Sequence, residues 1–218
     1  MFFSDYGSFM HKVIEMYLRG QLKKSELTSH YLLNFKKEVI GKPPTRDIFK
    51  SYFEQGLSYL NSFNFPYEKT LAIEQKYNFT IDDVKFTGVI DCVPEDSNGL
   101  IVLDNKSRAL KARSGRKKPT KSDRELDEYL KQLYIYSVPV KAEYGKYPSR
   151  LEFNCFRTQE LISEPFDEEA FENAKEWALR TIDKIIENDD WSPDMEYWKC
   201  RYLCDKNHQC EYFLMNRR

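Results

Sequence analysis

The sequence lacks several features that mark broad classes of protein. It has no run of apolar residues near twenty in length, no internal repeat and no low-complexity tract. A membrane-spanning helix and a secretory signal both need a sustained apolar stretch, so the sequence predicts a cytosolic (cytoplasmic) protein without membrane partners. It also has no GxxxxGK[ST] loop to cradle phosphates, which excludes a nucleotide-driven motor within this chain.

The chain has little net charge as well. Its 34 lysine and arginine residues face 35 aspartate and glutamate residues, for a net charge of -1, so the whole protein is not a polycation. Basic residues are concentrated between Lys106 and Arg124, where nine of them stand against the single acid Asp123. With 218 residues the chain is long enough for one domain with a full core, or one domain with a small appendage.

Two turn signals in the middle of the chain separate three apolar or alternating segments. Asp82-Asp83 lies between 71–81 and 84–90, and the run 96–99 precedes the apolar residues 100–103. Short polar turns between such segments are typical of hairpins. The sequence therefore predicts a three-stranded antiparallel meander.

The meander would bring two acids and a lysine together. Asp91 ends the second segment and Asp104 ends the third, so the hairpin places them side by side. Because residues two apart in a strand share a face, Lys106 projects with Asp104, whereas Asn105 offers only its backbone carbonyl. Carboxylate and carbonyl oxygens suit Mg²⁺ or Mn²⁺, and a metal-activated water beside a lysine can cleave a phosphodiester.

A simpler interpretation exists for each of these residues, namely a turn-flanking acid or a solvated lysine. The set at this spacing, with Gly88 three residues before Asp91, favours the metal site.

The basic segment begins at the lysine of this candidate site. It contains Ser114-Gly115-Arg116-Lys117-Lys118-Pro119, a sequence that suits no packed element, so we expect a mobile basic loop beside the site. Phosphate binding that tolerates any base sequence is one interpretation, and a solvated loop is the other. The candidate DNA-binding residues are Arg113, Arg116, Lys117, Lys118 and Lys121.

The motif that ends in Asp91, followed by Asp104-Asn105-Lys106, resembles the PD-(D/E)XK nuclease superfamily, and within it the RecB-like branch that includes the CRISPR-associated iron-sulfur exonucleases. The segment from Tyr6 to Gly20 is similar to the first helix of that family, and His11 inherits its role as a metal ligand. Glu74 stands where many members carry an additional acid. The resemblance covers nearly the whole chain, and it implies a restriction-endonuclease-like α/β fold with a mixed sheet flanked by helices.

The stretch from Gln132 to Tyr136 is similar to the QxxxY motif of the RecB-like branch, and the resemblance implies that these two residues position DNA. Taken alone, they lie on one face of a helix, where an ordinary helix surface is the default. His11 taken alone is more often a packed or surface histidine at the edge of an apolar helical stripe.

The five cysteines fall into two groups. Cys92 and Cys155 lie in strand patterns, where buried free thiols are expected. Cys200, Cys204 and Cys210 lie within eleven residues beside Trp198, a density typical of a metal site in an intracellular protein. In the resembled family, four cysteines hold a [4Fe-4S] cluster. Three of them lie near the C-terminus, as these three do, and the fourth lies ahead of the first helix.

The sequence departs from that family pattern. The spacing from Cys200 to Cys204 is one residue longer, and no cysteine precedes His11. One explanation is that an upstream segment with the fourth ligand is absent from this form. A zinc site completed by His208 and three unliganded thiols are the alternatives. Either a [4Fe-4S] cluster or a zinc ion would fasten the C-terminus without taking part in cleavage.

The remaining sequence completes a single predicted domain over 1–218. It comprises a helical part (1–65), the sheet with the basic loop and QxxxY helix (66–160), and a C-terminal helix with a Cys-rich tail (161–218). Helical periodicity over 25–63 is interrupted at 41–44, 150–157 reads as a strand, and a helix begins at Asp167. The predicted buried side of that last helix comprises Phe171, Ala174, Ala178, Ile182, Ile185 and Ile186.

By resemblance, the expected activity is hydrolysis of DNA with Mg²⁺ or Mn²⁺, as an exonuclease on single-stranded or end-bearing DNA in recombination, repair or phage DNA metabolism. One alternative is a nonhydrolytic DNA-binding subunit of a recombination complex. Another is the detached nuclease module of a helicase-nuclease, with the motor supplied by a partner protein.

Overall fold

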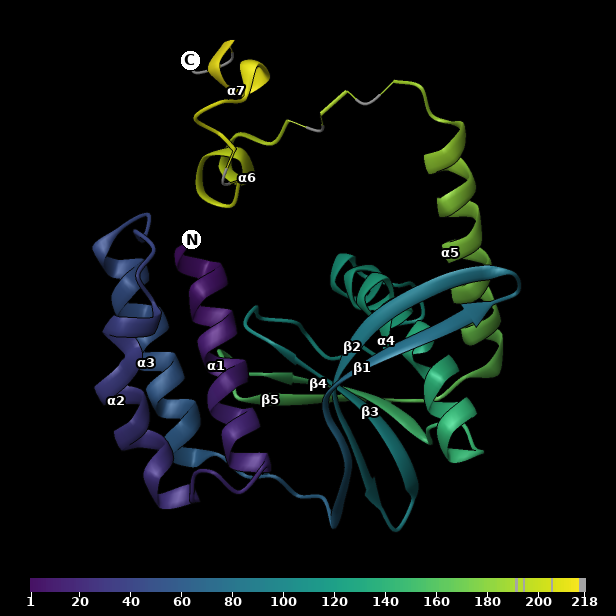
Figure 1. Ribbon diagram of the computed structural model, residues 1–218, viewed down its shortest axis with the longest axis horizontal. Helices are drawn as coiled ribbons and strands as arrows, with labels where there is room; N and C mark the ends of the chain where they lie inside the picture. Colours follow the sequence, from purple (N-terminus) through teal and green to yellow (C-terminus); the bar gives the residue numbers. More distant parts are fainter. Residues whose placement is uncertain (191, 194, 205, 216–218) are drawn as a thin grey trace.

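The computed structural model describes residues 1–190, 192–193, 195–204 and 206–215. The chain starts with helices, and then three strands, one long helix, two strands and the C-terminal helices follow (Figure 1). In chain order the elements are α1 (Phe2–Leu18), the 3-10 turn η1 (Lys24–Glu26), α2 (Leu27–Glu38), α3 (Arg46–Ser62), β1 (Lys69–Ile81), β2 (Val84–Asp96), β3 (Gly99–Lys106), α4 (Lys121–Tyr144), β4 (Arg150–Cys155), β5 (Glu160–Pro165), α5 (Glu168–Glu187), α6 (Tyr197–Tyr202) and α7 (Glu211–Met215).

The strands form one mixed sheet in the order β1-β2-β3-β4-β5. β1, β2 and β3 pair antiparallel, which confirms the predicted meander. β3 and β4 are parallel, and α4 supplies the long crossover that a parallel pair needs. β4 and β5 are again antiparallel. The mixed α/β architecture is the one that the sequence predicted.

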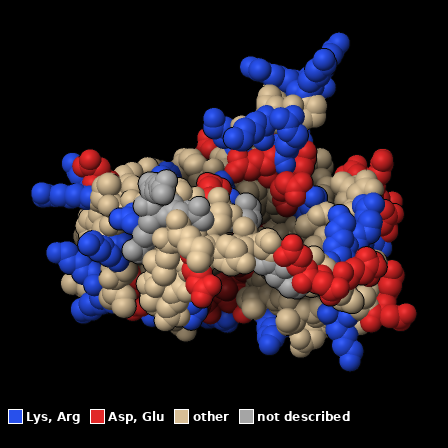
Figure 2. Space-filling model, turned by 90° about the horizontal axis from the view of Figure 1, so that it is seen from above, with Lys and Arg blue, Asp and Glu red and all other residues tan. Residues whose placement is uncertain are grey.

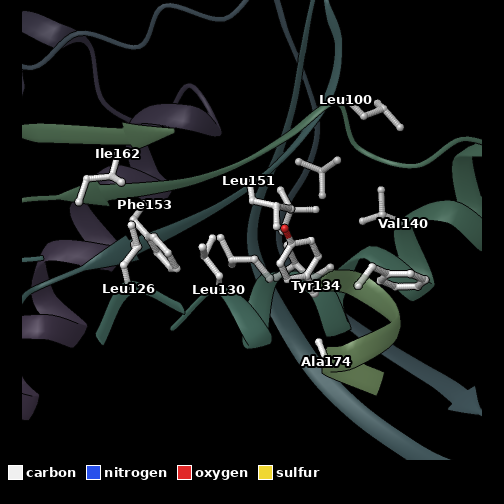
Figure 3. Packing of buried hydrophobic residues seen from close by; sticks show 14 of the residues in the cluster. Leu100, Leu126, Leu130, Tyr134, Val140, Leu151, Phe153, Ile162 and Ala174 are labelled. Atoms are coloured by element: carbon white, nitrogen blue, oxygen red, sulfur yellow. The ribbon is translucent and has the colours of Figure 1, made fainter. Parts of the chain in front are cut away.

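Helices cover the sheet from two sides (Figure 1). α4 and α5 pack against one side, where Leu126, Leu130 and Tyr134 of α4 meet Leu151 and Phe153 of β4 (Figure 3). α1, α2 and α3 form a second cluster on the other side, built largely from aromatic rings such as Phe9, Tyr31 and Phe35. These two clusters fix the sheet between the helices, so the residues at its centre have defined positions.

Three local predictions need comment. α5 begins as expected, because the Asp167 side chain caps it by accepting a 2.7 Å hydrogen bond from Ala170 N. The prediction that Ile185 and Ile186 are buried is wrong: they are 51% and 75% exposed, because the buried face of α5 ends at Ala178 and the last turns extend past the core. The predicted strand over 150–157 ends at Cys155, and a further strand, β5, follows after a turn.

Cys92 and Cys155 are buried free thiols, as predicted. None of the helices in the described part of the chain combines the length and apolar character needed to cross a bilayer.

Candidate metal centre and catalytic site

His11 of α1 faces the sheet. Phe9, Met10, Val13 and Ile14 are buried, which fixes the rotation of the helix about its axis. His11 then lies with Nδ1 3.4 Å from Glu74 Oε1 and 3.5 Å from Asp91 Oδ2. In the described residues, these three form the one group of at least three His, Cys, Asp or Glu side chains whose ligand atoms lie within 4.8 Å of one another.

Glu74 reaches this group from an unusual backbone conformation. Its φ is 45°, in the left-handed region that residues other than glycine seldom adopt. The neighbouring pairs Ile73↔Cys92 and Gln75↔Ile90 place it opposite Asp91, and Arg19 Nη2 donates a 2.8 Å hydrogen bond to the Ile73 carbonyl beside it. Strain of this kind costs about 1–3 kcal/mol and concentrates at functional sites.

The hairpin between β2 and β3 supplies the two aspartates. Cys92 pairs with Leu103, so the flanking residues Asp91 and Asp104 stand opposite each other, as the turn signals predicted. Asn105 N donates a 2.7 Å hydrogen bond to Asp91 Oδ2. The Asn105 carbonyl oxygen lies 3.0 Å from His11 Nε2, so the backbone of this residue faces the site.

Lys106 connects the acids to α4. Its Nζ lies 2.7 Å from Asp104 Oδ2 as an ion pair that lacks hydrogen-bond geometry. Nζ also donates a 3.1 Å hydrogen bond to Gln132 Oε1, and Gln132 Nε2 donates a 3.0 Å bond to the Tyr136 hydroxyl. The predicted glutamine and tyrosine therefore do lie on one helix face, and that face is turned towards the lysine.

The structure adds two aromatic residues that sequence reasoning missed. The Lys106 ammonium lies 5.5 Å from the ring centroid of Tyr129 and 5.6 Å from that of Phe153. Both distances are in the range of cation–π attraction. Tyr129 is three residues before Gln132, so helical spacing from the QxxxY motif was the available signal, whereas Phe153 comes from β4 and no local pattern links it to the lysine.

Burial perturbs the titration of the site. Loss of solvation, reinforced by the Asp104 charge, raises the pKa of Asp91 to about 7. Burial also raises the pKa of Asp104, although the Lys106 charge opposes this. Burial disfavours protonation of His11, but the hydrogen bond to Glu74 and the Asp91 charge outweigh it, and the pKa of His11 is raised. Asp91 and Asp104 are therefore harder to ionise than solvated aspartates, and a bound cation would favour their ionised forms.

These observations fit a divalent cation. The donor set of one imidazole, carboxylates and a carbonyl suits a hard or borderline ion. His11 Nε2 and the Asn105 carbonyl oxygen are 3.0 Å apart, a hydrogen-bond distance, so the nitrogen turned towards the carboxylates of Glu74 and Asp91 is Nδ1. Asp104 Oδ2 is a buried oxygen without a hydrogen bond of good geometry, and the Lys106 ammonium at 2.7 Å balances part of its charge.

The basic segment is more ordered than predicted. Asp123, buried at the start of α4, accepts hydrogen bonds from the backbone and hydroxyl groups of both Ser114 and Thr120. These bonds close the loop at its base, which argues against a freely mobile segment. The tip carries Arg116, Lys117 and Lys118, all exposed.

Of the other predicted DNA-binding residues, Lys121 is exposed, whereas Arg113 already has two carboxylate partners, Glu164 and Asp127, each at 2.9 Å. Figure 2 shows lysine and arginine gathered on a projecting part of the molecule, whereas charges of both signs mix over the rest of that face.

The C-terminal cysteines are not gathered into a ligand set. Cys200, Cys204 and Cys210 are half-buried free thiols, and with His208 they do not form a group of three ligand atoms within 4.8 Å. Cys200 Sγ instead contacts Met195 Sδ at 3.9 Å.

The sequence of the chain matches one family model of known proteins. No curated protein shows significant similarity to the chain. The family model of the PD-(D/E)XK nuclease superfamily matches residues 3–211, which includes His11, both aspartates of the hairpin, Lys106 and the QxxxY helix. The chain therefore belongs to the PD-(D/E)XK nuclease superfamily.

Proposed function

We propose that this protein is a deoxyribonuclease that requires Mg²⁺ or Mn²⁺ and hydrolyses phosphodiester bonds at the site around His11. The observation that carries the proposal is the placement of Lys106 Nζ 2.7 Å from Asp104, beside a partly buried group of candidate metal ligands. The hydrogen bond to Gln132 holds the Lys106 ammonium in one position beside the acids, whereas a solvated lysine would have no fixed position.

The metal ligands in this proposal are His11, Asp91, Asp104 and the Asn105 carbonyl, with Glu74 as an additional acid. When bound, the ion supplies Lewis acidity to the scissile phosphate and the attacking water. The bond from water oxygen to phosphorus forms as the water gives up a proton to the solvent. One phosphorus–oxygen ester bond breaks, and the leaving oxygen takes up a proton from the solvent. Lys106 donates hydrogen bonds to this centre and offsets the negative charge that develops there.

Gln132 and Tyr136 have different roles in this proposal. Gln132 acts by orienting Lys106, and Tyr136 acts by guiding the DNA strand. Gln132 accepts from the lysine, so it orients the ammonium towards Asp104. Tyr136 accepts from Gln132, its ring packs over Gly88 of β2, and in this proposal it steers the strand. The QxxxY spacing supports assignment to the RecB-like branch, and with it exonucleolytic action on single-stranded or end-bearing DNA in recombination or repair.

The C-terminal cysteines have no role in this chemistry. A cluster or a zinc ion held by them would fasten the C-terminus, so the proposal assigns no step of the cleavage to either.

The test is cleavage of end-labelled single-stranded and double-stranded DNA with Mg²⁺, Mn²⁺ or EDTA. Asp104→Asn and Lys106→Met keep the side-chain size and remove one ligand or one charge, and each is expected to lower the rate at least 10²-fold. Asp83→Asn and Lys146→Met, at exposed positions, are matched controls and are expected to cleave at the wild-type rate.

Metal-dependent cleavage that both site variants lose would support the hydrolase. A folded, metal-binding chain that cleaves nothing would favour a nonhydrolytic DNA-binding subunit. Cleavage that appears only with an added helicase would favour a nuclease module of a larger complex.

A further inference from the structure

A groove runs along α1 past the candidate metal centre. It has a volume of about 700 Å³ and extends along α1 from Phe3, past His11 and Glu74, to Lys12 and Glu15. Ser4, Ser8 and Ser107 contribute hydroxyl groups to its walls. The groove is therefore a polar surface that is continuous with the candidate metal centre. The proposed cleavage chemistry does not use the part of it that lies beyond His11.

The middle of the groove is open because the side chains of Gly7 and the three serines are small. Gly7 faces Ser107 across it, and a methyl group at the glycine would lie 3.3 Å from the serine hydroxyl oxygen. Ser4 and Ser8, one helical turn apart, are exposed along the same wall. Serine hydroxyls are common partners of phosphate oxygens in nucleic-acid complexes, and they carry no base preference.

The far end of the groove has an aromatic wall. Phe3 lines the groove, and its ring lies 5.8 Å from that of Trp198 at an angle of 41°. Trp198 belongs to α6, which lies beyond the N-terminal end of α1 (Figure 1), and its side chain is 46% exposed. An exposed indole beside a second ring offers a face on which an unpaired base can stack.

The length of the groove sets how much of a strand it holds. Phe3 and His11 are eight residues apart on one helix, which corresponds to about 12 Å at 1.5 Å per residue. Nucleotides stacked at about 3.4 Å would place about three of them between the metal centre and the aromatic wall.

We propose that this groove binds the single DNA strand next to the scissile phosphate, with its phosphates along Ser4 and Ser8 and a base stacked against Phe3 and Trp198. The inference rests on the proposed nuclease function, and it specifies the substrate as a strand whose bases are unpaired. In a blunt duplex the bases are paired and stacked on one another, so none of them can turn out onto the aromatic wall.

The experiment measures binding apart from cleavage. Fluorescence anisotropy of a labelled oligo(dT) and of a blunt duplex is recorded with Ca²⁺, and gels confirm that the DNA stays intact. Ser8→Glu and Ser4→Glu put negative charge in the groove, whereas Ser29→Glu, an equally exposed serine on α2, is the matched control. Trp198→Ala removes the outer ring, and Trp198→Phe restores an aromatic face.

We expect oligo(dT) to bind more tightly than the blunt duplex. Ser8→Glu and Ser4→Glu are expected to weaken oligo(dT) binding about tenfold and Ser29→Glu less than twofold. Trp198→Ala is expected to weaken it at least about fivefold, with recovery in Trp198→Phe. Melting temperatures equal to the wild type confirm that each variant is folded.

Wild-type affinity in both groove variants would overturn the inference, even if the enzyme cleaves DNA. Failure of the wild-type chain to bind oligo(dT) would overturn it as well. Groove-dependent binding without any metal-dependent hydrolysis would leave the inference standing and refute the proposed nuclease function instead.

Discussion

The ring of Tyr136 lies directly against the α-carbon of Gly88, so that a methyl group added to the glycine would come within 2.8 Å of ring atom Cε1. Tyr136 in turn accepts a hydrogen bond from Gln132, which accepts one from Lys106. A glycine in β2 thereby positions a helix residue that orients the lysine of the candidate site.

The first prediction concerns this contact. Gly88→Ala is expected to displace the Tyr136 ring and lower the cleavage rate about 10- to 100-fold, because Lys106 loses its orientation. The measurement is the single-turnover rate at saturating Mn²⁺. In a Tyr136→Ala background the same substitution should have almost no further effect, since the ring is gone. Additive losses in the double variant would show that Gly88 acts in another way.

The second prediction concerns the strained glutamate. Glu74→Gly allows the positive φ and removes a carboxylate from the acidic group, so the melting temperature in EDTA is expected to rise. The rise in melting temperature on adding Mn²⁺ should shrink, because a candidate ligand is lost. Glu74→Gln, which keeps the strain and removes the charge, separates the two effects. An unchanged response to Mn²⁺ in both variants would remove Glu74 from the metal site.

The third prediction concerns pH. The pKa of Asp91 is raised to about 7 in the folded chain, so the folded state holds a proton that the unfolded chain releases near pH 4. The stability from this proton is complete below pH 4 and is lost as pH rises through 7. We expect the metal-free protein to lose a few kcal/mol of stability over that window, and Asp91→Asn to flatten the profile.

Metal affinity should have the opposite dependence on pH. A cation binds the ionised carboxylate, so Mn²⁺ affinity is expected to increase about tenfold per pH unit below 7 and then to level off. Isothermal titration calorimetry in two buffers would detect the released proton. Binding that is independent of pH from 5 to 8 would contradict a role for Asp91 as ligand.

The fourth prediction concerns the tip of the basic loop. Replacing Arg116, Lys117 and Lys118 by alanine is expected to weaken binding of DNA of any sequence. The slope of log affinity against log salt should also fall by about 0.7 for each lost contact to a single strand. Arg113→Ala should instead lower the melting temperature, because Glu164 and Asp127 lose their partner. An unchanged salt slope in the triple variant would exclude this loop from the DNA interface.

The sequence was informative where a short-range rule governs structure. Turn residues and a period of two predicted the β1–β3 meander and the alignment of Asp104 with Lys106. A period near 3.6 placed Gln132 and Tyr136 on one helix face. In each of these cases the decisive interactions lie within a few residues or across one tight hairpin.

The rest depends on contacts between distant segments. The strand β5 was missed because it is an edge strand of six residues with only Ile162 buried, so its hydrophobic pattern is weak. The ion pairs of Arg113 join residues 14 and 51 positions apart, and composition alone gave no sign of them. Ile185 and Ile186 follow the helical stripe of α5 but extend past the core, which periodicity cannot detect.

The single parallel pair in the sheet has a consequence for how the protein is made. The β1–β3 meander is local and can form soon after its last residue leaves the ribosome, whereas β4 joins β3 only after the crossover through α4 has been synthesised. The two hairpin aspartates are therefore in place early, but Gln132, Tyr136 and Phe153 reach Lys106 late. A nascent chain could in this way hold a cation before it has an oriented lysine, so its hydrolytic capacity would appear only when the last third of the chain begins to fold.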